Sequence, residues 1–347
     1  MTRQSSFLET HLPRIWQKRG VIAALLWPLS RLYGIVVAMR RRRYSSGRLT
    51  VTLLPVPVII VGNVYVGGTG KTPVVIWLIE ALRRAGRMPG VISRGYGGKN
   101  DAPQIVTDSS SAREVGDEPL LIAQRAGCPV VVSRRRVQAA QRLLQAFPDV
   151  DVVISDDGLQ HYALARDVEI VLFDARGIGN GWLLPAGPLR EPASRPRDVT
   201  IINAPALPAD APHGTWHMTL AGDTAWNLAA PSQSLPISSL QMHAGSGVPR
   251  IAAAAGIGNP SRFFGMLRDM GLSVTEIPLP DHYDYVEDPF AHVDADLILI
   301  TEKDAVKCRQ HPTLANDARL WVVPVSARID EALAHTILEK LRGPSTA

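Results

Sequence analysis

One stretch constrains the fold of this chain more than any other, because it joins three elements in a fixed order. An apolar, β-branched run at residues 58–61 leads into a glycine-rich loop that ends in Gly70, Lys71 and Thr72, and a helix-like run at residues 74–85 follows. In this context glycines let backbone N–H groups close around phosphate oxygens, and the helix N-terminus adds partial positive charge. The stretch therefore predicts a phosphate-binding loop, in which Lys71 reaches the phosphates and Thr72 holds Mg²⁺.

The loop departs from the usual spacing of phosphate-binding loops, which places a glycine five residues before Gly70. Tyr65 occupies that position here, and the nearest glycine upstream of it is Gly62. The loop must therefore be longer than the common form or bent differently. The alternative interpretation is a glycine-rich turn that binds nothing.

Length, cysteine content and charge narrow the class of protein. A chain of 347 residues fits two domains, and two cysteines are too few for a disulfide framework and lack metal-ligand spacing, which fits a reducing cytoplasm. The net charge of +5 is concentrated at the front, where residues 1–50 hold ten Lys and Arg against one acidic residue. This distribution indicates that the basic front end binds an anionic surface, and it argues against a uniformly basic nucleic-acid-binding protein. We expect a basic segment at 1–50, a nucleotide-binding domain at 51–203 and a second α/β domain at 204–347.

Residues 21–39 form a strongly apolar run that is followed by four arginines at residues 40–43. The run approaches the length of a membrane span, but Pro28 and Arg31 lie near its middle, and a central arginine costs about 2.5–3.5 kcal/mol. We therefore expect an amphipathic helix that lies in the membrane interface, with the arginines against anionic lipid. The alternative is a helix that packs on the core of the protein itself.

A second informative stretch is the apolar run at residues 151–155, which ends in Asp156 and Asp157. A strand that ends in a carboxylate is typical of the element that holds Mg²⁺ beside a phosphate-binding loop. Two adjacent carboxylates repel each other, and a cation relieves that repulsion. The alternative is a turn, in which Asp and Gly are common.

Further candidate residues lie at strand ends and in loops. The strand predicted at residues 88–96 ends in Arg94, which is suited to contact a phosphate, and Tyr96, which is suited to stack on a base. A plain turn explains both residues almost as well. The Gly/Pro-rich segment at residues 177–196 cannot form the interior of a helix or strand, so we expect a long loop. Arg190 is its candidate to contact a phosphate, and Glu191 is its candidate to bind a metal.

Four titratable residues have both a structural and a functional interpretation. Asp117 opens a predicted helix, where a carboxylate favours the helix dipole. His282 follows an aspartate in a rigid loop, which is an arrangement suited to proton transfer or simply a surface turn. Lys303 and Asp304 resemble the base-reading element of GTPases, whereas capping of a helix by Thr301 explains Asp304 without any ligand.

Taken in order, these motifs resemble those of the tetraacyldisaccharide 4'-kinases, the lipid A kinases of Gram-negative envelopes. The matching segments are residues 62–63, 67–73, 93–97, 116–119, 156–161, 187–192, 281–283 and 301–307. The lengthened loop is the form that this family has. The resemblance implies an α/β fold, namely a P-loop kinase-like α/β/α sandwich with a second, smaller α/β domain and an N-terminal membrane-associated helix.

The resemblance also implies an activity and a site. The family transfers the γ-phosphoryl group of ATP, with Mg²⁺, to the 4'-hydroxyl of an acylated glucosamine disaccharide 1-phosphate at the cytoplasmic face of the inner membrane. By this resemblance Asp117, oriented by His282, would be the base, and Lys71 would serve the phosphates. The nucleotide would be held by Gly62, Asn63, Gly67, Gly68, Thr69, Gly70, Lys71, Thr72, Arg94, Tyr96 and Arg190, and the metal by Thr72, Asp156, Asp157 and Glu191. Gln160 and His161 would lie around the same site.

Two other classes of protein share some of these features. A nucleotide-switched P-loop GTPase or metal-insertion chaperone would also have the glycine loop and the Lys303-Asp304 pair, but the sequence has no Cys or His cluster for a metal cargo. A soluble small-molecule kinase would have the same nucleotide motifs with the N-terminal helix in its core. We expect no nucleic acid and no stable protein partner.

Overall fold

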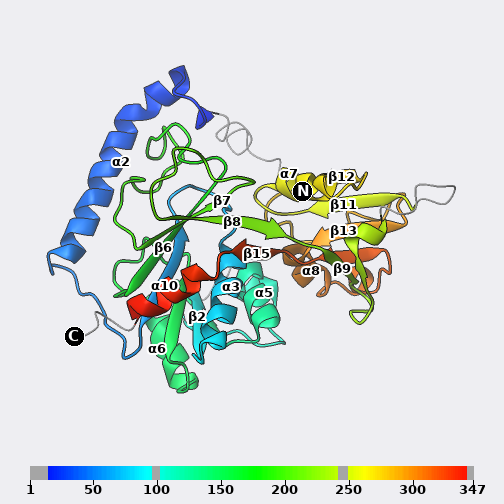
Figure 1. Ribbon diagram of the computed structural model, residues 1–347, viewed down its shortest axis with the longest axis horizontal. Coiled ribbons are helices and arrows are strands. Elements are labelled where there is room, and N and C mark those ends of the chain that lie inside the picture. Colours follow the sequence, from blue (N-terminus) through cyan, green and yellow to red (C-terminus); the bar gives the residue numbers. More distant parts are fainter. Residues whose placement is uncertain (1–14, 96–101, 241–248, 342–347) are drawn as a thin grey trace.

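The computed structural model describes residues 15–95, 102–240 and 249–341, and the statements below concern these residues. They form two β-sheets, a larger and a smaller one, with helices on their faces, and a long helix, α2, at the periphery (Figure 1). This is the mixed α/β architecture that the sequence predicts.

The larger sheet has nine strands in the order β15-β8-β7-β6-β1-β5-β2-β4-β3. Neighbours from β8 to β4 are parallel, and the edge strands β3 and β15 are antiparallel. The strands are β1 (Val58–Asn63), β2 (Pro89–Ser93), β3 (Gln104–Ile105), β4 (Val130–Val132), β5 (Val152–Asp156), β6 (Val168–Asp174), β7 (Val199–Asn203), β8 (Thr215–Ala221) and β15 (Ser326–Ile329). Its helices are α3 (Lys71–Arg84), α4 (Ala112–Val115), α5 (Asp117–Ala126), α6 (Arg136–Ala146) and α10 (Ala332–Leu341).

Burial on both faces explains why the central strands are apolar without interruption. In β1, Ile59 and Val61 pack in a core that α3, α5 and α10 complete, and Val58 and Ile60 pack in a second core that α6 completes. Because successive side chains of a strand point to opposite faces, the run at residues 58–61 contributes to both cores. The carboxyl ends of the parallel strands share one edge, where ligand sites of such sheets form.

The smaller sheet has six strands in the order β10-β9-β14-β13-β11-β12. They are β9 (Thr224–Asn227), β10 (Ser234–Pro236), β11 (Ile251–Ala255), β12 (Thr275–Pro278), β13 (Leu297–Thr301) and β14 (Leu320–Val323). One face packs against α7 (Pro260–Asp269), and the other against α8 (Glu302–Cys308) and α9 (Pro312–Ala315); a short 3-10 helix, η1 (Ile237–Leu240), follows β10.

The predicted boundary at residue 203 does not coincide with the division between the sheets. Strands β8 and β15 both lie beyond that residue, yet they extend the larger sheet, and α10 packs against α3. The chain therefore crosses between the two sheets after β8 and again before β15. The strand expected at residues 215–220 is present, antiparallel to β15 but parallel to β7.

Helix α2 (Val21–Ser45) lies on the side of the larger sheet away from the smaller one (Figure 1). Among the described helices it alone is long and apolar enough to cross a membrane, and its most apolar window has a mean hydropathy of 1.8 with only 11% buried. Leu25 is 75% exposed and Leu32 is 60% exposed. This exposure is contrary to the alternative in which the helix belongs to the protein core.

Candidate active site

The glycine-rich loop runs from the end of β1 to the start of α3, and Asn63 holds its shape. The fully buried side chain of Asn63 donates hydrogen bonds from Nδ2 to the carbonyls of Tyr65 (2.6 Å) and Gly67 (2.9 Å). Its Oδ1 accepts a hydrogen bond from Lys71 Nζ at 3.1 Å. One side chain thus closes the lengthened loop and fixes the lysine that follows it.

The last glycine of the loop is required by its surroundings. Gly70 has φ +93° at the N-cap of α3, and a Cβ there would lie 2.4 Å from Nδ2 of Asn203. Asn203, at the end of β7, donates from that nitrogen to the Thr69 carbonyl at 3.0 Å. Any side chain at this position would therefore displace the contact that holds the loop from the side.

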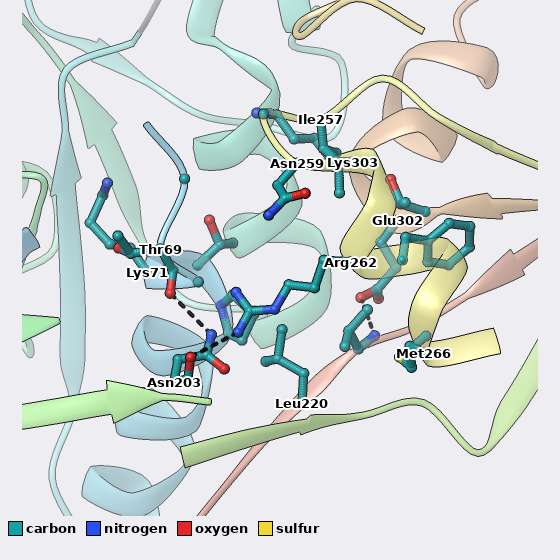
Figure 2. A pocket seen from close by; sticks show the side chains of 18 of the residues that line it. Thr69, Lys71, Asn203, Leu220, Ile257, Asn259, Arg262, Met266, Glu302 and Lys303 are labelled. Atoms are coloured by element: carbon teal, nitrogen blue, oxygen red, sulfur yellow. Dashed lines mark hydrogen bonds between the residues drawn. The ribbon is translucent and has the colours of Figure 1, made fainter. Parts of the chain in front are cut away.

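A cavity of ≈ 510 Å³ opens in front of the loop, between the two sheets. Its walls are loop residues 68–73 from the larger sheet and the starts of α7 and α8 from the smaller one. Figure 2 shows Arg262 of α7 reaching across to Asn203, whose carbonyl accepts its hydrogen bond at 3.1 Å. A cleft between two units beside a phosphate-binding loop is a common place for a nucleotide.

Asp156 and Asp157 lie at the same sheet edge as the loop. Strand β5 pairs with β1 in a parallel register that sets Asp156 opposite Val61, so the carboxyl ends of both strands lie at the same edge. Asp157 follows β5 with φ +48°, and its carboxylate lies 3.5 Å from Lys71 Nζ and 3.3 Å from Arg190. Burial raises the pKa of Asp157, but the charges of Lys71 and Arg190 more than offset this and lower it.

The surroundings of Asp156 fit a divalent cation. The side chain is 1% exposed, and Oδ2 accepts from Ser93 while Oδ1 has no hydrogen-bond partner among the described residues. Burial, followed by the charge of Glu118, raises the pKa of Asp156. Because an unpaired buried carboxylate oxygen is costly, a cation would stabilise it.

The protein alone does not supply a complete metal cage. Among the described residues there is no group of three or more His, Cys, Asp or Glu that could hold a metal. Mg²⁺ is usually bound by one or two carboxylates together with phosphates and water, so Asp156 and the hydroxyl of Thr72, in the first turn of α3, are sufficient protein ligands. Asp157 already has Lys71 beside one carboxylate oxygen and Arg190 beside the other.

Asp117 and His282 come from different sheets and meet beside the cleft. Asp117, the first residue of α5, is 5% exposed, and its Oδ2 accepts a hydrogen bond from His282 Nδ1 at 2.9 Å. The hydrogen bond to Asp117 raises the pKa of His282. Burial raises the pKa of Asp117, but the hydrogen bond from His282 and the charge of Lys303 reverse this and hold it well below its usual range.

The structure does not bring Glu191 to the other carboxylates. Its side chain is 1% exposed, and both oxygens lie 3.0 Å from Arg195. It also lines a second cavity, of ≈ 260 Å³, against α2. The carboxylate of Glu191 is therefore engaged in a buried ion pair, and its predicted role as a metal ligand stays a prediction.

Of the other residues predicted to contact the nucleotide, some lie in the loop and others lie away from the cleft. Gly67 and Gly68 lie in the loop, whereas Gly62 lies inside β1, where a Cβ would be 2.8 Å from Leu159. Arg94 is exposed and does not line the cleft, and Tyr96 lies outside the described residues. Gln160 accepts from Arg190 at 3.4 Å, and burial lowers the pKa of His161 to about 4.

Three contacts were not predicted from the sequence. Arg176 donates to the Gly68 carbonyl at 2.9 Å, and its guanidinium lies 4.3 Å from the centre of the Tyr65 ring. Asn203 of β7 holds the loop, and Arg262 of α7 donates to the carbonyl of Asn203. Asn203 could have been found as a polar residue that ends an apolar strand, but nothing in the local sequence marks Arg176 or Arg262.

The Gly/Pro-rich segment connects this site to α2. Arg190, whose backbone N–H donates to the Val64 carbonyl at 2.7 Å, contacts Asp157 through its side chain. The carbonyl of Arg190 accepts from Tyr33 of α2 at 3.1 Å, and the Leu183 carbonyl accepts from Ser30 at 2.7 Å. The long loop therefore contacts Asp157 on one side, through Arg190, and the apolar helix on the other.

Comparison with known proteins identifies relatives along the whole chain. The family profile described as tetraacyldisaccharide-1-P 4'-kinase matches residues 22–342. Proteins named tetraacyldisaccharide 4'-kinase are 60% identical in Janthinobacterium sp. (strain Marseille), with 100% of both chains covered, and 58% identical in Herminiimonas arsenicoxydans, with 99% of both covered. A solved LpxK structure from Aquifex aeolicus, in complex with ATP, matches with a TM-score of 0.76 and 29% identity over 92% of this chain and 100% of that one.

Proposed function

This chain belongs to the tetraacyldisaccharide 4'-kinase family, and from that premise we propose how its residues carry out the reaction. The enzyme is a transferase that phosphorylates the 4'-hydroxyl of tetraacyldisaccharide 1-phosphate with ATP and Mg²⁺ in lipid A biosynthesis.

The nucleotide is proposed to lie in the interdomain cleft, with its phosphates in the loop at residues 67–72. Lys71 and Arg190, which flank Asp157, would neutralise charge on the transferring phosphoryl group. Asp156 and Thr72 would hold Mg²⁺, which would neutralise phosphate charge when bound. Asp157 keeps the two cationic side chains in place before the nucleotide arrives.

Asp117 is proposed to take the proton of the sugar hydroxyl. The sugar oxygen bonds to the γ-phosphorus as the bond from that phosphorus to the β–γ bridging oxygen breaks, ADP leaves, and the proton passes to the carboxylate. A pKa held below its usual range keeps Asp117 ionised at neutral pH, ready to accept a hydrogen bond from the hydroxyl. Because bond formation to phosphorus is late in such reactions, a weak base suffices.

The observation that carries this proposal is the 2.9 Å contact between Asp117 and His282. The two residues belong to different sheets and meet next to Glu118 and Lys303, which line the cleft. Because the carboxylate comes from the larger-sheet side of the cleft and the imidazole from the smaller-sheet side, this pair is suited to a reaction that needs both sides in place.

We also propose that α2 lies in the cytoplasmic leaflet of the inner membrane. Its exposed apolar residues would enter the lipid, and the arginines at residues 40–43 would contact anionic head groups. The acyl chains of the substrate would then stay in the bilayer while the sugar enters the cleft beside Arg190. No stable protein partner is required.

The rival interpretation as a GTP-dependent switch is not favoured. Asp304, the carboxylate that would read guanine, is fully buried and accepts hydrogen bonds from Thr301 and from the Gly256 N–H. It is therefore engaged within its own sheet. The family match is to a kinase.

The direct test incubates the purified protein with [γ-³²P]ATP, Mg²⁺ and tetraacyldisaccharide 1-phosphate in detergent micelles. Thin-layer separation is expected to show a product with one more phosphate, labelled at the 4'-position. Omission of the lipid is the control. ATP hydrolysis without labelled lipid would contradict the proposal.

A further inference from the structure

Helix α8 carries charged residues that the reaction described above does not use. In this seven-residue helix, Asp304 is fully buried and Lys307 is 9% exposed. Burial of charges is costly unless they are paired, and even paired ones add little stability compared with apolar residues of the same volume. Their burial is therefore better explained by the groups that they contact than by stability.

Lys307 lies against the proposed base. Its Nζ is 3.5 Å from Oδ2 of Asp117 and 3.9 Å from Oδ1 of Asp304, and it is 5.5 Å from the centre of the Tyr285 ring. The ammonium group thus lies between a carboxylate of the larger sheet and one of the smaller sheet. Lys303, one turn earlier, is 3.8 Å from the same oxygen of Asp117.

Asp304 also holds the loop that presents His282. Its carboxylate accepts from the Gly256 N–H at 3.1 Å and from the Thr301 hydroxyl at 2.6 Å. The carbonyl of Gly256 in turn accepts from the backbone N–H of His282 at 3.2 Å. His282 has φ +58°, which is unfavourable for a residue with a side chain, so this hydrogen bond helps to maintain the conformation.

These contacts converge on one carboxylate from two directions. Asp304 sets Lys307 by charge, and it sets His282 through the backbone of Gly256. We propose that Asp304 is a positioning residue, which fixes from the smaller sheet both Lys307 and the loop of His282, the two groups that orient and hold the Asp117 carboxylate. This inference rests on the proposed role of Asp117, and it assigns a purpose to the motif at residues 301–307.

The test uses Asp304→Asn, which keeps the volume but removes the charge that faces Lys307, and Lys307→Met, which keeps the length of the side chain. Neither residue is among the described residues that line the cleft. We therefore expect kcat to fall about 10- to 100-fold in each variant, because the carboxylate is displaced, while KM for ATP changes less than twofold. Lys340→Met, at an exposed lysine paired with Asp198, is the matched control and should leave both constants unchanged.

The double variant provides a second measurement. If both residues act on the same carboxylate, Asp304→Asn with Lys307→Met should lower kcat by much less than the product of the two single effects. Unchanged kcat in the single variants, or a rise in KM for ATP equal to the loss of kcat/KM, would overturn the inference. Should Asp304→Asn fail to fold, the kcat of Lys307→Met decides alone.

Failure of this inference can be separated from failure of the proposed function. Asp117→Asn is measured in parallel by the same assay. Full turnover by Asp117→Asn would remove its role as the base, and with it the basis of this inference. Loss of turnover in Asp117→Asn alone, with unchanged rates in the two α8 variants, would overturn only the positioning role of Asp304.

Discussion

Truncation of Asn63 to alanine should weaken ATP binding, because this side chain closes the lengthened phosphate-binding loop. Asn63→Ala removes the hydrogen bonds from Nδ2 to the carbonyls of Tyr65 and Gly67. Each such bond contributes about 0.5–1.5 kcal/mol net, so the bound shape of the loop loses about 1–3 kcal/mol. At 1.4 kcal/mol per factor of ten, this corresponds to an ATP dissociation constant raised about 5- to 150-fold. The contact of Lys71 with Asn63 is not counted, since Lys71 keeps Asp157 as a partner.

The assay is isothermal titration calorimetry with ATP and Mg²⁺, together with thermal unfolding of the same samples. Asn227→Ala is a matched control, because Asn227 is also a buried asparagine at a strand end. It bonds the Ala318 carbonyl and two backbone N–H groups, but it lies in the smaller sheet away from the cleft. Asn227→Ala should lower the unfolding temperature and leave ATP affinity unchanged. An affinity for Asn63→Ala within twofold of the parent would refute the reasoning and show that other contacts hold the loop.

Three further predictions concern Glu191, the contact between Asp117 and His282, and the exposed apolar residues of α2. Glu191→Gln removes one of the two carboxylate partners of buried Arg195, which keeps Glu169, and should cost about 1–3 kcal/mol of unfolding free energy in urea titrations with no change in the Mg²⁺ dependence of kcat; a raised Mg²⁺ requirement would instead assign this carboxylate to the metal. The pKa of His282 is raised in the folded protein, so its contact with Asp117 stabilises fully below the pKa of about 6.5 in the unfolded chain and is lost as pH rises through the folded pKa. The pKa of Asp117 is lowered, so its contribution persists as the pH falls to about 4. The unfolding temperatures of the parent and His282→Gln should therefore differ more at pH 6 than at pH 8.5, and an equal difference would contradict this. Replacing exposed Leu25 and Leu32 with serine should reduce sedimentation with anionic vesicles at least tenfold and leave the unfolding temperature unchanged, and undiminished sedimentation would argue against the anchor.

The parts of the site that the sequence predicted are those encoded by adjacent residues. A β-branched run before Gly70-Lys71-Thr72 and another before Asp156-Asp157 each predict a strand with a ligand group at its end, and both strands occur side by side. The α/β fold itself is implied by the resemblance that these motifs carry. The strand inferences need only local pattern and the rule that parallel strands end at one edge.

The parts that could not be predicted depend on residues distant in sequence. Asp117 and His282 are separated by 165 residues, and only the resemblance to a known family paired them. Periodicity could not show that β8 and β15 belong to the larger sheet, because the alternation of a strand's side chains does not reveal which strands pair with it. Glu191 follows Arg190 directly, yet its buried partner Arg195 gives it a structural position that the motif alone does not reveal.

The most direct test of the central claim is single-turnover transfer by Asp117→Asn, with ATP binding measured on the same sample. Asparagine keeps the size of the side chain and cannot accept the hydroxyl proton. We predict an ATP dissociation constant within about twofold of the parent and labelled lipid formed at least about 100-fold more slowly. Lipid phosphorylated at the parental rate by this variant would show that a different group deprotonates the sugar.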